Sequence, residues 1–452
     1  MHVSHGKRLT RARRGAGTAL AVTALLGAAI AASGPASATD KAAPRAAAKA
    51  APKAPAAAAA DCSDAYKIEK TVDGGTTWRM CWHYNTLSGL ILDKISYQPK
   101  GEAKPIPVLT SARLAQVHVP YDDGQAEFDD ITGTDFGRAL QTLKTSECPG
   151  GTIKTVKVPD RGNVSGLCVT TRARGHAYRL NNDASTGGTG KVYTGQGRDL
   201  LVYTVNKASW YEYITEWRFS SDGTISSNVG ATGSLSPYDF DGGDSRGWPI
   251  GKGDQAKAES HSHNVFWRMN FGLDGSPKAK VEQYDSKVTP PPAGGGSPTT
   301  RTTRTPVTKE LAGDRKDMRW WRVVSTAGKN KDGHPRSYEI VPGPSQKHAG
   351  RPYTKHDVFF TQYKKCEQYA SNNPSCGNNV PASVDKWVDG QTLTHPITWV
   401  NIGFHHIARD EDQQPMPVHW QGFSMAPRDV TAMSPLTPGD LAGQNGKPPL
   451  GG

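Results

Sequence analysis

Segments in which every second residue is aromatic or aliphatic constrain the fold of this 452-residue chain more than any other feature. Residues 209–219 (SWYEYITEWRF) are the clearest case, and Asp222-Gly223 then provides turn chemistry. Side chains alternate between the two faces of a strand, so four aromatic residues share one face: Tyr211, Tyr213, Trp217 and Phe219. Residues 261–271, 398–407 and 417–425 are similar, and long helical periodicities are scarce. The sequence predicts an all-β fold.

The first 38 residues have the composition of a signal peptide. Five basic residues between positions 7 and 14 precede an apolar run at 16–32, and Ala36-Ser37-Ala38 is a small-X-small cleavage pattern. A transmembrane anchor is the alternative, but the run is shorter than the ~20 residues that span a bilayer. We therefore expect cleavage after Ala38, a secreted, extracellular protein, and no membrane span.

Residues 39–60 consist mainly of alanine, proline and lysine and have almost no large apolar side chains. Such a segment cannot bury enough surface to offset the entropy of ordering, so it is predicted to be a disordered tether. The signal peptide and the tether carry most of the formal net charge of +12 and leave about +4 for residues 61–452. No basic stripe is interleaved with aromatic residues, so nucleic acid is not an expected partner.

The cysteines all follow the tether, and their even number is typical of disulfides in an oxidising compartment. Several pairings are open in principle. Short loops and sequence order favour three of them: Cys62–Cys81, Cys148–Cys168 and Cys366–Cys376. A cysteine-rich metal site is the alternative, but no CxxC spacing supports it.

Two histidines two residues apart form a candidate metal site. His261 and His263 would lie on the same face of a strand, about 6–7 Å apart, and could present two imidazoles to one ion. A hydrogen-bonded or surface pair is the alternative. His405-His406 lies in an apolar segment where an unpartnered histidine is costly, and it offers a third imidazole. Three imidazoles suit copper(II) or zinc.

The last of these segments resembles a known family. Residues 402–412 (IGFHHIARDED), with 415–418 and 422–423, are similar to the C-terminal copper-ligand segment of copper amine oxidases. His406 falls at the ligand position, and residues 261–275 resemble the family's HxH hairpin. The resemblance implies copper(II) held by His261, His263 and His406 in a large β-sandwich of the family's catalytic-domain type at 61–452.

The segments between the histidines follow the family's order. This order changes the interpretation of residues 286–306. Residues 286–306 (SKVTPPPAGGGSPTTRTTRTP) would ordinarily predict an interdomain linker. They fall where the family has a long surface excursion. We therefore expect an internal surface loop within one domain. Only the tether precedes Cys62, so the resemblance implies a catalytic domain alone.

The family's quinone cofactor forms from a tyrosine within T-x-x-N-Y-[DE]-Y. Residues 207–213 (KASWYEY) match this motif, which makes Tyr211 the predicted topaquinone precursor, although Lys207 and Trp210 replace the threonine and asparagine. An inward-facing strand aromatic is the alternative for Tyr211. The same resemblance makes Tyr121 the tyrosine that hydrogen-bonds a quinone oxygen.

The resemblance assigns the catalytic base to Asp130, with Asp129 as an alternative if the alignment slips by one residue. A solvated loop carboxylate is the alternative for either. Cys148 and Cys168 match the family's disulfide. The family's calcium-ligand positions are Asn270 and His395 here, and calcium prefers several oxygen ligands, so we expect that site to be absent.

The implied activity is oxidation of primary amines by dioxygen to aldehydes, with release of ammonia and hydrogen peroxide, by a homodimer. Two alternatives stay open: a copper-binding relative without quinone that acts as a structural or binding protein, and an unrelated secreted β-sandwich such as a carbohydrate-binding module. Glu127 lies near the predicted base. An acidic entrance there would favour diamines, polyamines or peptidyl lysine as substrates.

Overall fold

The computed structural model describes residues 63–238, 247–377 and 383–450. The predicted signal peptide, the tether and Cys62, the predicted partner of Cys81, lie outside the described residues. Among the described residues, no helix is long and apolar enough to cross a membrane.

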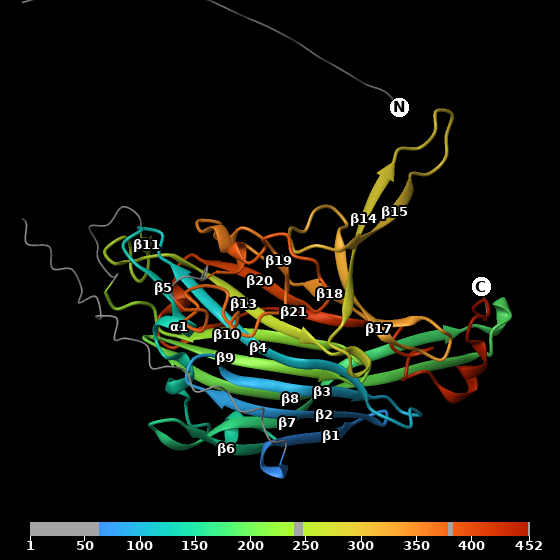
Figure 1. The fold of residues 1–452 in the computed structure, drawn as a ribbon, viewed down its shortest axis with the longest axis horizontal. Helices are drawn as coiled ribbons and strands as arrows, with labels where there is room; N and C mark the ends of the chain where they lie inside the picture. Colours follow the sequence, from blue (N-terminus) through green and yellow to red (C-terminus); the bar gives the residue numbers. More distant parts are fainter. Residues whose placement is uncertain (1–62, 239–246, 378–382, 451–452) are drawn as a thin grey trace, which may run out of the picture. The chain divides into compact units, whose positions relative to one another are not determined.

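Two large antiparallel sheets contain most of the described strands (Figure 1). The first sheet runs in the order β1 (Lys67–Val72), β2 (Thr76–Asn85), β3 (Gly89–Gln98), β4 (Ile106–Pro120), β13 (His261–Phe271), β20 (Pro396–His406), β19 (Val358–Gln362) and β16 (Leu311–Gly313), with β5 (Glu127–Asp129) paired to β4. The second runs in the order β15 (Thr299–Val307), β14 (Ala279–Thr289), β17 (Trp320–Lys329), β18 (Pro335–Pro342), β21 (Met416–Arg428), β10 (Ile225–Gly233), β9 (Tyr211–Ser220), β8 (Lys191–Ala208), β7 (Gly162–Asn182) and β6 (Thr152–Val158). The prediction of an all-β protein is confirmed.

The remaining described elements are short. The two-stranded ribbon consists of β11 (Trp248–Pro249) and β12 (Lys257–Ala258), and α1 covers Asp130–Gly133. The 3-10 turns are Asp64–Tyr66, Phe136–Ala139, Thr145–Glu147, Ala184–Thr186, Leu273–Gly275, Pro352–Thr354, Val384–Lys386, Asp410–Asp412 and Gly439–Gln444.

The two sheets pack face to face through large aromatic side chains, as the sandwich prediction requires. Trp78 of β2 is fully buried, and its indole N–H donates to the carbonyl of Ser220 at the end of β9, 2.9 Å away. Trp267 of β13 contacts Phe423 of β21, with ring centroids 5.2 Å apart. Burying such side chains stabilises the sandwich, by about 1.5–3 kcal/mol for a residue the size of Phe. The core therefore lies between the sheets.

Residues 287–306 are exposed, as a surface excursion requires, but the prediction that the segment 286–306 is a loop is wrong. Most of this segment belongs to a hairpin in which β14 pairs with β15, and only the proline- and glycine-rich residues 290–298 form the connection. The hairpin projects from the sandwich (Figure 1). The reason lies in residues 299–305 (TTRTTRT), where five of the seven residues are threonines, whose β-branched side chains favour extended backbone.

Two of the predicted disulfides are present. Cys148 is bonded to Cys168, and Cys366 to Cys376. The first connects β7 to the turn before β6, and the second closes a short loop between β19 and β20. Both pairings follow from short loop length and sequence order.

Candidate functional site

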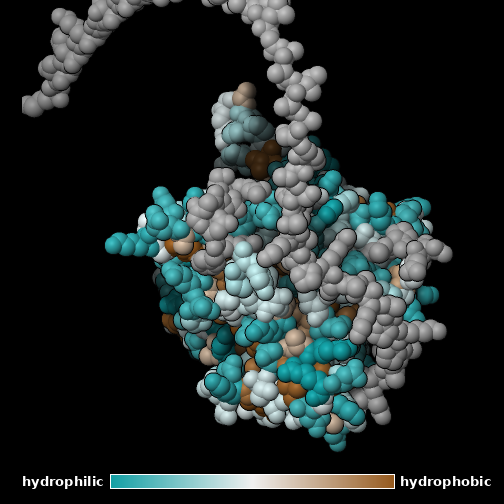
Figure 2. Space-filling view, turned by 90° about the vertical axis from the view of Figure 1, so that its left-hand side faces the viewer, coloured by the Kyte–Doolittle hydropathy of each residue, from teal (hydrophilic) through white to brown (hydrophobic). Residues whose placement is uncertain are grey.

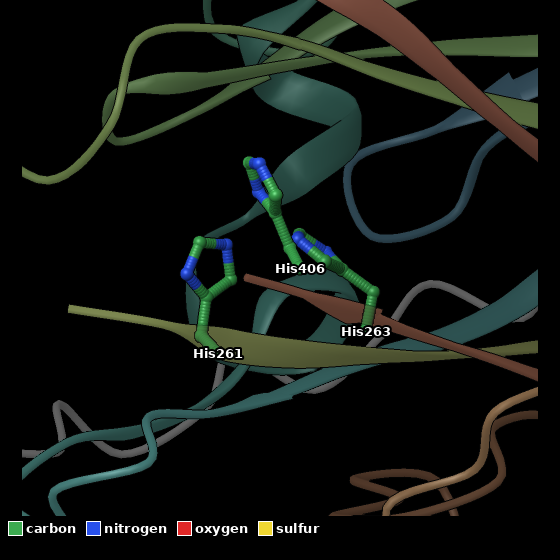
Figure 3. A group of neighbouring side chains, drawn as sticks. All are labelled: His261, His263 and His406. Carbon is green, nitrogen blue, oxygen red and sulfur yellow. The ribbon is translucent and has the colours of Figure 1, made fainter. Parts of the chain in front are cut away.

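The pairing of two central strands brings the three predicted imidazoles together. In the register between β13 and β20, His261 lies opposite His406 and His263 lies opposite Phe404. His261 and His263 share a face of β13 because they are two residues apart. Figure 3 shows the three rings gathered on one side of these strands. All three side chains are buried, with at most 2% exposed.

The geometry of these rings fits a metal ion. One ligand nitrogen from each histidine lies within 4.8 Å of the others. Within the described part of the chain, Nε2 of His263 is buried without a hydrogen-bond partner. Leaving a buried polar nitrogen unpaired costs about 1–3 kcal/mol, a cost that a metal bond would offset. Three neutral imidazoles suit copper or zinc.

Burial also sets the protonation state of the imidazoles. It lowers the pKa of His261 to about 3, with a smaller contribution from the charge of His406, and it holds the pKa of His263 well below the usual range. Both rings are therefore neutral at physiological pH, which is the form that binds a metal.

Asp412 orients His406 and was missed in the sequence, although it ends the segment that resembles the copper-ligand motif. Its buried carboxylate accepts a hydrogen bond from Nε2 of His406 at 2.9 Å and a second from Nε2 of His419 at 3.2 Å. A proton on Nε2 leaves the lone pair of His406 on Nδ1, toward the cluster. Such carboxylate–histidine pairs fix the tautomer and the orientation of metal ligands.

Tyr211, the predicted cofactor precursor, lies against the histidine cluster. It begins β9, and its hydroxyl oxygen is 2.8 Å from both Nε2 of His261 and Nδ1 of His406. Its ring also packs edge-on against His263. Burial raises the pKa of Tyr211 well above the usual value. Tyr211 does face inward as a strand aromatic, and its hydroxyl meets two candidate metal ligands.

Asp130 and Asp129 have different surroundings. Asp130 begins α1, and its Oδ2 accepts a hydrogen bond from the hydroxyl of Tyr213 at 2.8 Å. Asp129 is bonded instead to His118 and to Ser371, each at 3.0 Å. Burial raises the pKa of Asp130 to about 7, although the Tyr213 hydrogen bond opposes this. Asp130 is connected to the histidine cluster through the Tyr213 hydroxyl, which also lies 3.2 Å from Nδ1 of His263. A carboxylate with a pKa near 7 can accept and release a proton near neutral pH.

Tyr121 lies beside the cluster, where Trp210 contacts it. Its ring stacks on His261 with centroids 4.8 Å apart, and its hydroxyl accepts the indole N–H of Trp210 at 3.1 Å. Trp210 also packs edge-to-face against Phe128 and Tyr238. Trp210, one of the two residues that depart from the family motif, is thus a direct partner of Tyr121.

Glu127 does not provide the open negative charge that the substrate prediction assumed. Arg351 donates to its carboxylate through both Nε, at 2.7 Å, and Nη2, and Nε2 of His118 lies 2.9 Å away. These contacts, first among them the Arg351 hydrogen bond, lower the pKa of Glu127. Figure 2 faces the end of the sandwich where β5 lies in Figure 1. The described surface visible there is mostly hydrophilic, with scattered hydrophobic residues. The charge-based reason for preferring diamines therefore loses its support.

The two residues at the predicted calcium positions are hydrogen-bonded to each other. Nε2 of His395 lies 2.8 Å from Oδ1 of Asn270, so each satisfies a polar atom of the other. The expected absence of calcium stays a prediction.

Comparisons with known proteins agree with this geometry. A family model described as copper amine oxidase, enzyme domain, matches residues 75–438. The chain is 23% identical over 416 residues to the protein named amine oxidase [copper-containing] alpha 2, peroxisomal, of Arabidopsis thaliana, covering 82% of this chain and 60% of that one. It is 25% identical over 410 residues to histamine oxidase of Arthrobacter globiformis, covering 82% and 57%.

The fold is also similar to that of a solved structure. A copper-containing benzylamine oxidase from Hansenula polymorpha superposes with a TM-score of 0.68 at 21% identity, over 81% of this chain and 62% of that one. The chain spans about 60% of the length of the curated relatives above. The family match removes the alternative of an unrelated β-sandwich.

Proposed function

Because this chain belongs to the copper amine oxidase family, we propose that it is a copper- and topaquinone-dependent oxidase that converts primary amines and dioxygen to aldehydes, ammonia and hydrogen peroxide. The observation that carries the proposal is the position of Tyr211. Its hydroxyl lies 2.8 Å from two of the three histidines that could hold copper.

The residues of the cluster have separate roles in this proposal. When bound, copper supplies the oxidation of Tyr211 by dioxygen, and the resulting quinone supplies the carbonyl and the electron sink for amine oxidation. His261, His263 and His406 would hold the metal, and Asp412 keeps the lone pair of His406 directed toward the place where the metal would bind. The buried surroundings of Tyr211 exclude bulk water from the ring.

Asp130 is the proposed catalytic base. It removes the proton from the substrate carbon next to nitrogen, and its raised pKa matches this role, because a base works best when its pKa is near the working pH. Tyr121 packs on His261 and is held by Trp210, so it forms a side wall of the site.

The pH dependence of activity follows from Asp130. The base form is the carboxylate, so kcat/KM should rise as pH increases through about 7 and fall below it. Measuring kcat/KM for one primary amine from pH 5 to 9 checks this. A rising limb centred near the usual aspartate pKa of about 4 would contradict the assignment.

A copper-binding protein without quinone is the second candidate, favoured by Lys207 and Trp210 at two motif positions. Treating copper-loaded, aerated protein with a hydrazine separates the two. Our proposal expects a coloured adduct and a modified Tyr211 peptide by mass spectrometry. Bound copper with neither would leave only the second candidate.

Secretion and a homodimer complete the proposal. Secretion is supported by the signal-peptide pattern of residues 1–38 and by the two disulfides. The homodimer is supported by the family resemblance alone. For the substrate we propose the class of primary amines, since the paired carboxylate of Glu127 gives no reason to require a second cationic group.

A further inference from the structure

We propose that Tyr213 is a positioning residue that connects the base Asp130 to the metal ligand His263 through a single hydroxyl group. The roles of these two partners rest on the proposed function. The connection itself rests on the two hydrogen bonds of the Tyr213 hydroxyl.

The contacts of Tyr213 have a defined direction. Its hydroxyl oxygen lies 2.8 Å from Oδ2 of Asp130 and 3.2 Å from Nδ1 of His263, and its side chain is fully buried. A hydroxyl has one proton, and an ionised carboxylate can only accept. When Asp130 is ionised, as it must be to act as the base, the proton of Tyr213 goes to Asp130 and the hydroxyl oxygen accepts the N–H of His263.

This direction determines the tautomer of His263. A proton on Nδ1 leaves the lone pair on Nε2, the buried nitrogen that has no hydrogen-bond partner in the described part of the chain. Reversing the Tyr213 hydroxyl would put the proton on Nε2 and remove a metal ligand. Tyr213 thus does for His263 what Asp412 does for His406.

The same hydroxyl tunes Asp130. Asp129 beside this carboxylate raises its pKa and His118 from β4 lowers it, while the carboxylate in turn raises the pKa of Tyr211 on β9. A hydrogen bond to the charged form favours that form, so Tyr213 makes ionisation of the buried carboxylate easier. One side chain thereby supports both the metal ligand and the base.

Tyr213→Phe tests the connection in the full copper-loaded protein. The rising limb of kcat/KM should move upward by about one pH unit, as expected for losing a hydrogen bond to a charged group. Copper affinity, measured by chelator competition independently of activity, should fall by roughly 10- to 100-fold. Tyr338→Phe is the matched control, because Tyr338 is equally buried and its hydroxyl donates to the carbonyl of Gly223 instead. It should change neither quantity.

A second pair of variants tests the direction of the hydrogen bonds without altering Tyr213. Asp130→Asn keeps an acceptor for the Tyr213 hydroxyl and should leave copper affinity within about twofold. Asp130→Leu removes the acceptor, so the hydroxyl turns to His263 and copper affinity should fall at least about tenfold. Equal copper affinities in wild type, Tyr213→Phe and Asp130→Leu would overturn the inference. A missing quinone with these copper effects intact would overturn the proposed function alone.

Discussion

Loss of bound copper, and with it loss of the quinone chromophore, is the expected result of His263→Ala. The substitution removes one of the three imidazoles at the site, and the remaining two cannot complete it. Loss of a residue that only hydrogen-bonds a metal ligand lowers metal affinity by roughly 10- to 100-fold. Loss of the ligand His263 itself should lower copper affinity by more than that. Metal analysis after dialysis and the visible spectrum after aerobic copper loading measure both effects.

His405→Ala is the matched control for this experiment. His405 is adjacent to a proposed ligand in the sequence, but it lies partly exposed and its Nε2 is 2.8 Å from Oδ2 of Asp122. We expect it to keep both copper and quinone. Retention of a full copper equivalent by His263→Ala would refute the ligand assignment.

Asp130→Asn should keep copper and quinone and lose turnover. An amide cannot accept the substrate proton, and general-base catalysis contributes roughly 10²- to 10⁴-fold, so kcat/KM should fall by that factor. The asparagine can still accept the Tyr213 hydroxyl, which leaves the cluster in place. Steady-state kinetics with a primary amine, alongside hydrazine titration of the quinone, separates lost turnover from lost cofactor.

Asp129→Asn distinguishes the two neighbouring carboxylates. Asp129 is held by His118 and Ser371, so its substitution should have a much smaller effect on kcat/KM than that of Asp130. The reverse order would mean that the base is Asp129 and that the one-residue slip considered from the sequence is correct.

The sequence predicted those parts of the site that depend on local periodicity or on a resemblance. Alternation along 261–271 placed His261 and His263 on one face, and that is where they lie. The apolar segment offered His405 or His406 as a third imidazole, and the resemblance selected His406, because no local rule relates either residue to β13. The register of β13 and β20 brings it opposite His261.

Contacts between distant side chains were not predictable in this way. Glu127 was interpreted as a free carboxylate because Arg351, its partner, is 224 residues away in the sequence. The role of Tyr213 likewise depends on two elements, α1 and β13, that meet it only in the folded sandwich. The hairpin at 286–306 was missed for a different reason, since its glycines and prolines and the resemblance to a surface excursion were given more weight than the threonines at 299–305.

The register of β13 and β20 also determines when during folding the site can form. These strands are far apart in the sequence, and closing long loops costs entropy before the contacts compensate, so such pairings form slowly. A slip of one residue would turn His261 and His263 to the opposite face of the sheet. Copper uptake by a refolding chain should therefore lag behind the appearance of strand structure. The copper content of a preparation should then measure the fraction of molecules in which β13 and β20 are paired in the correct register.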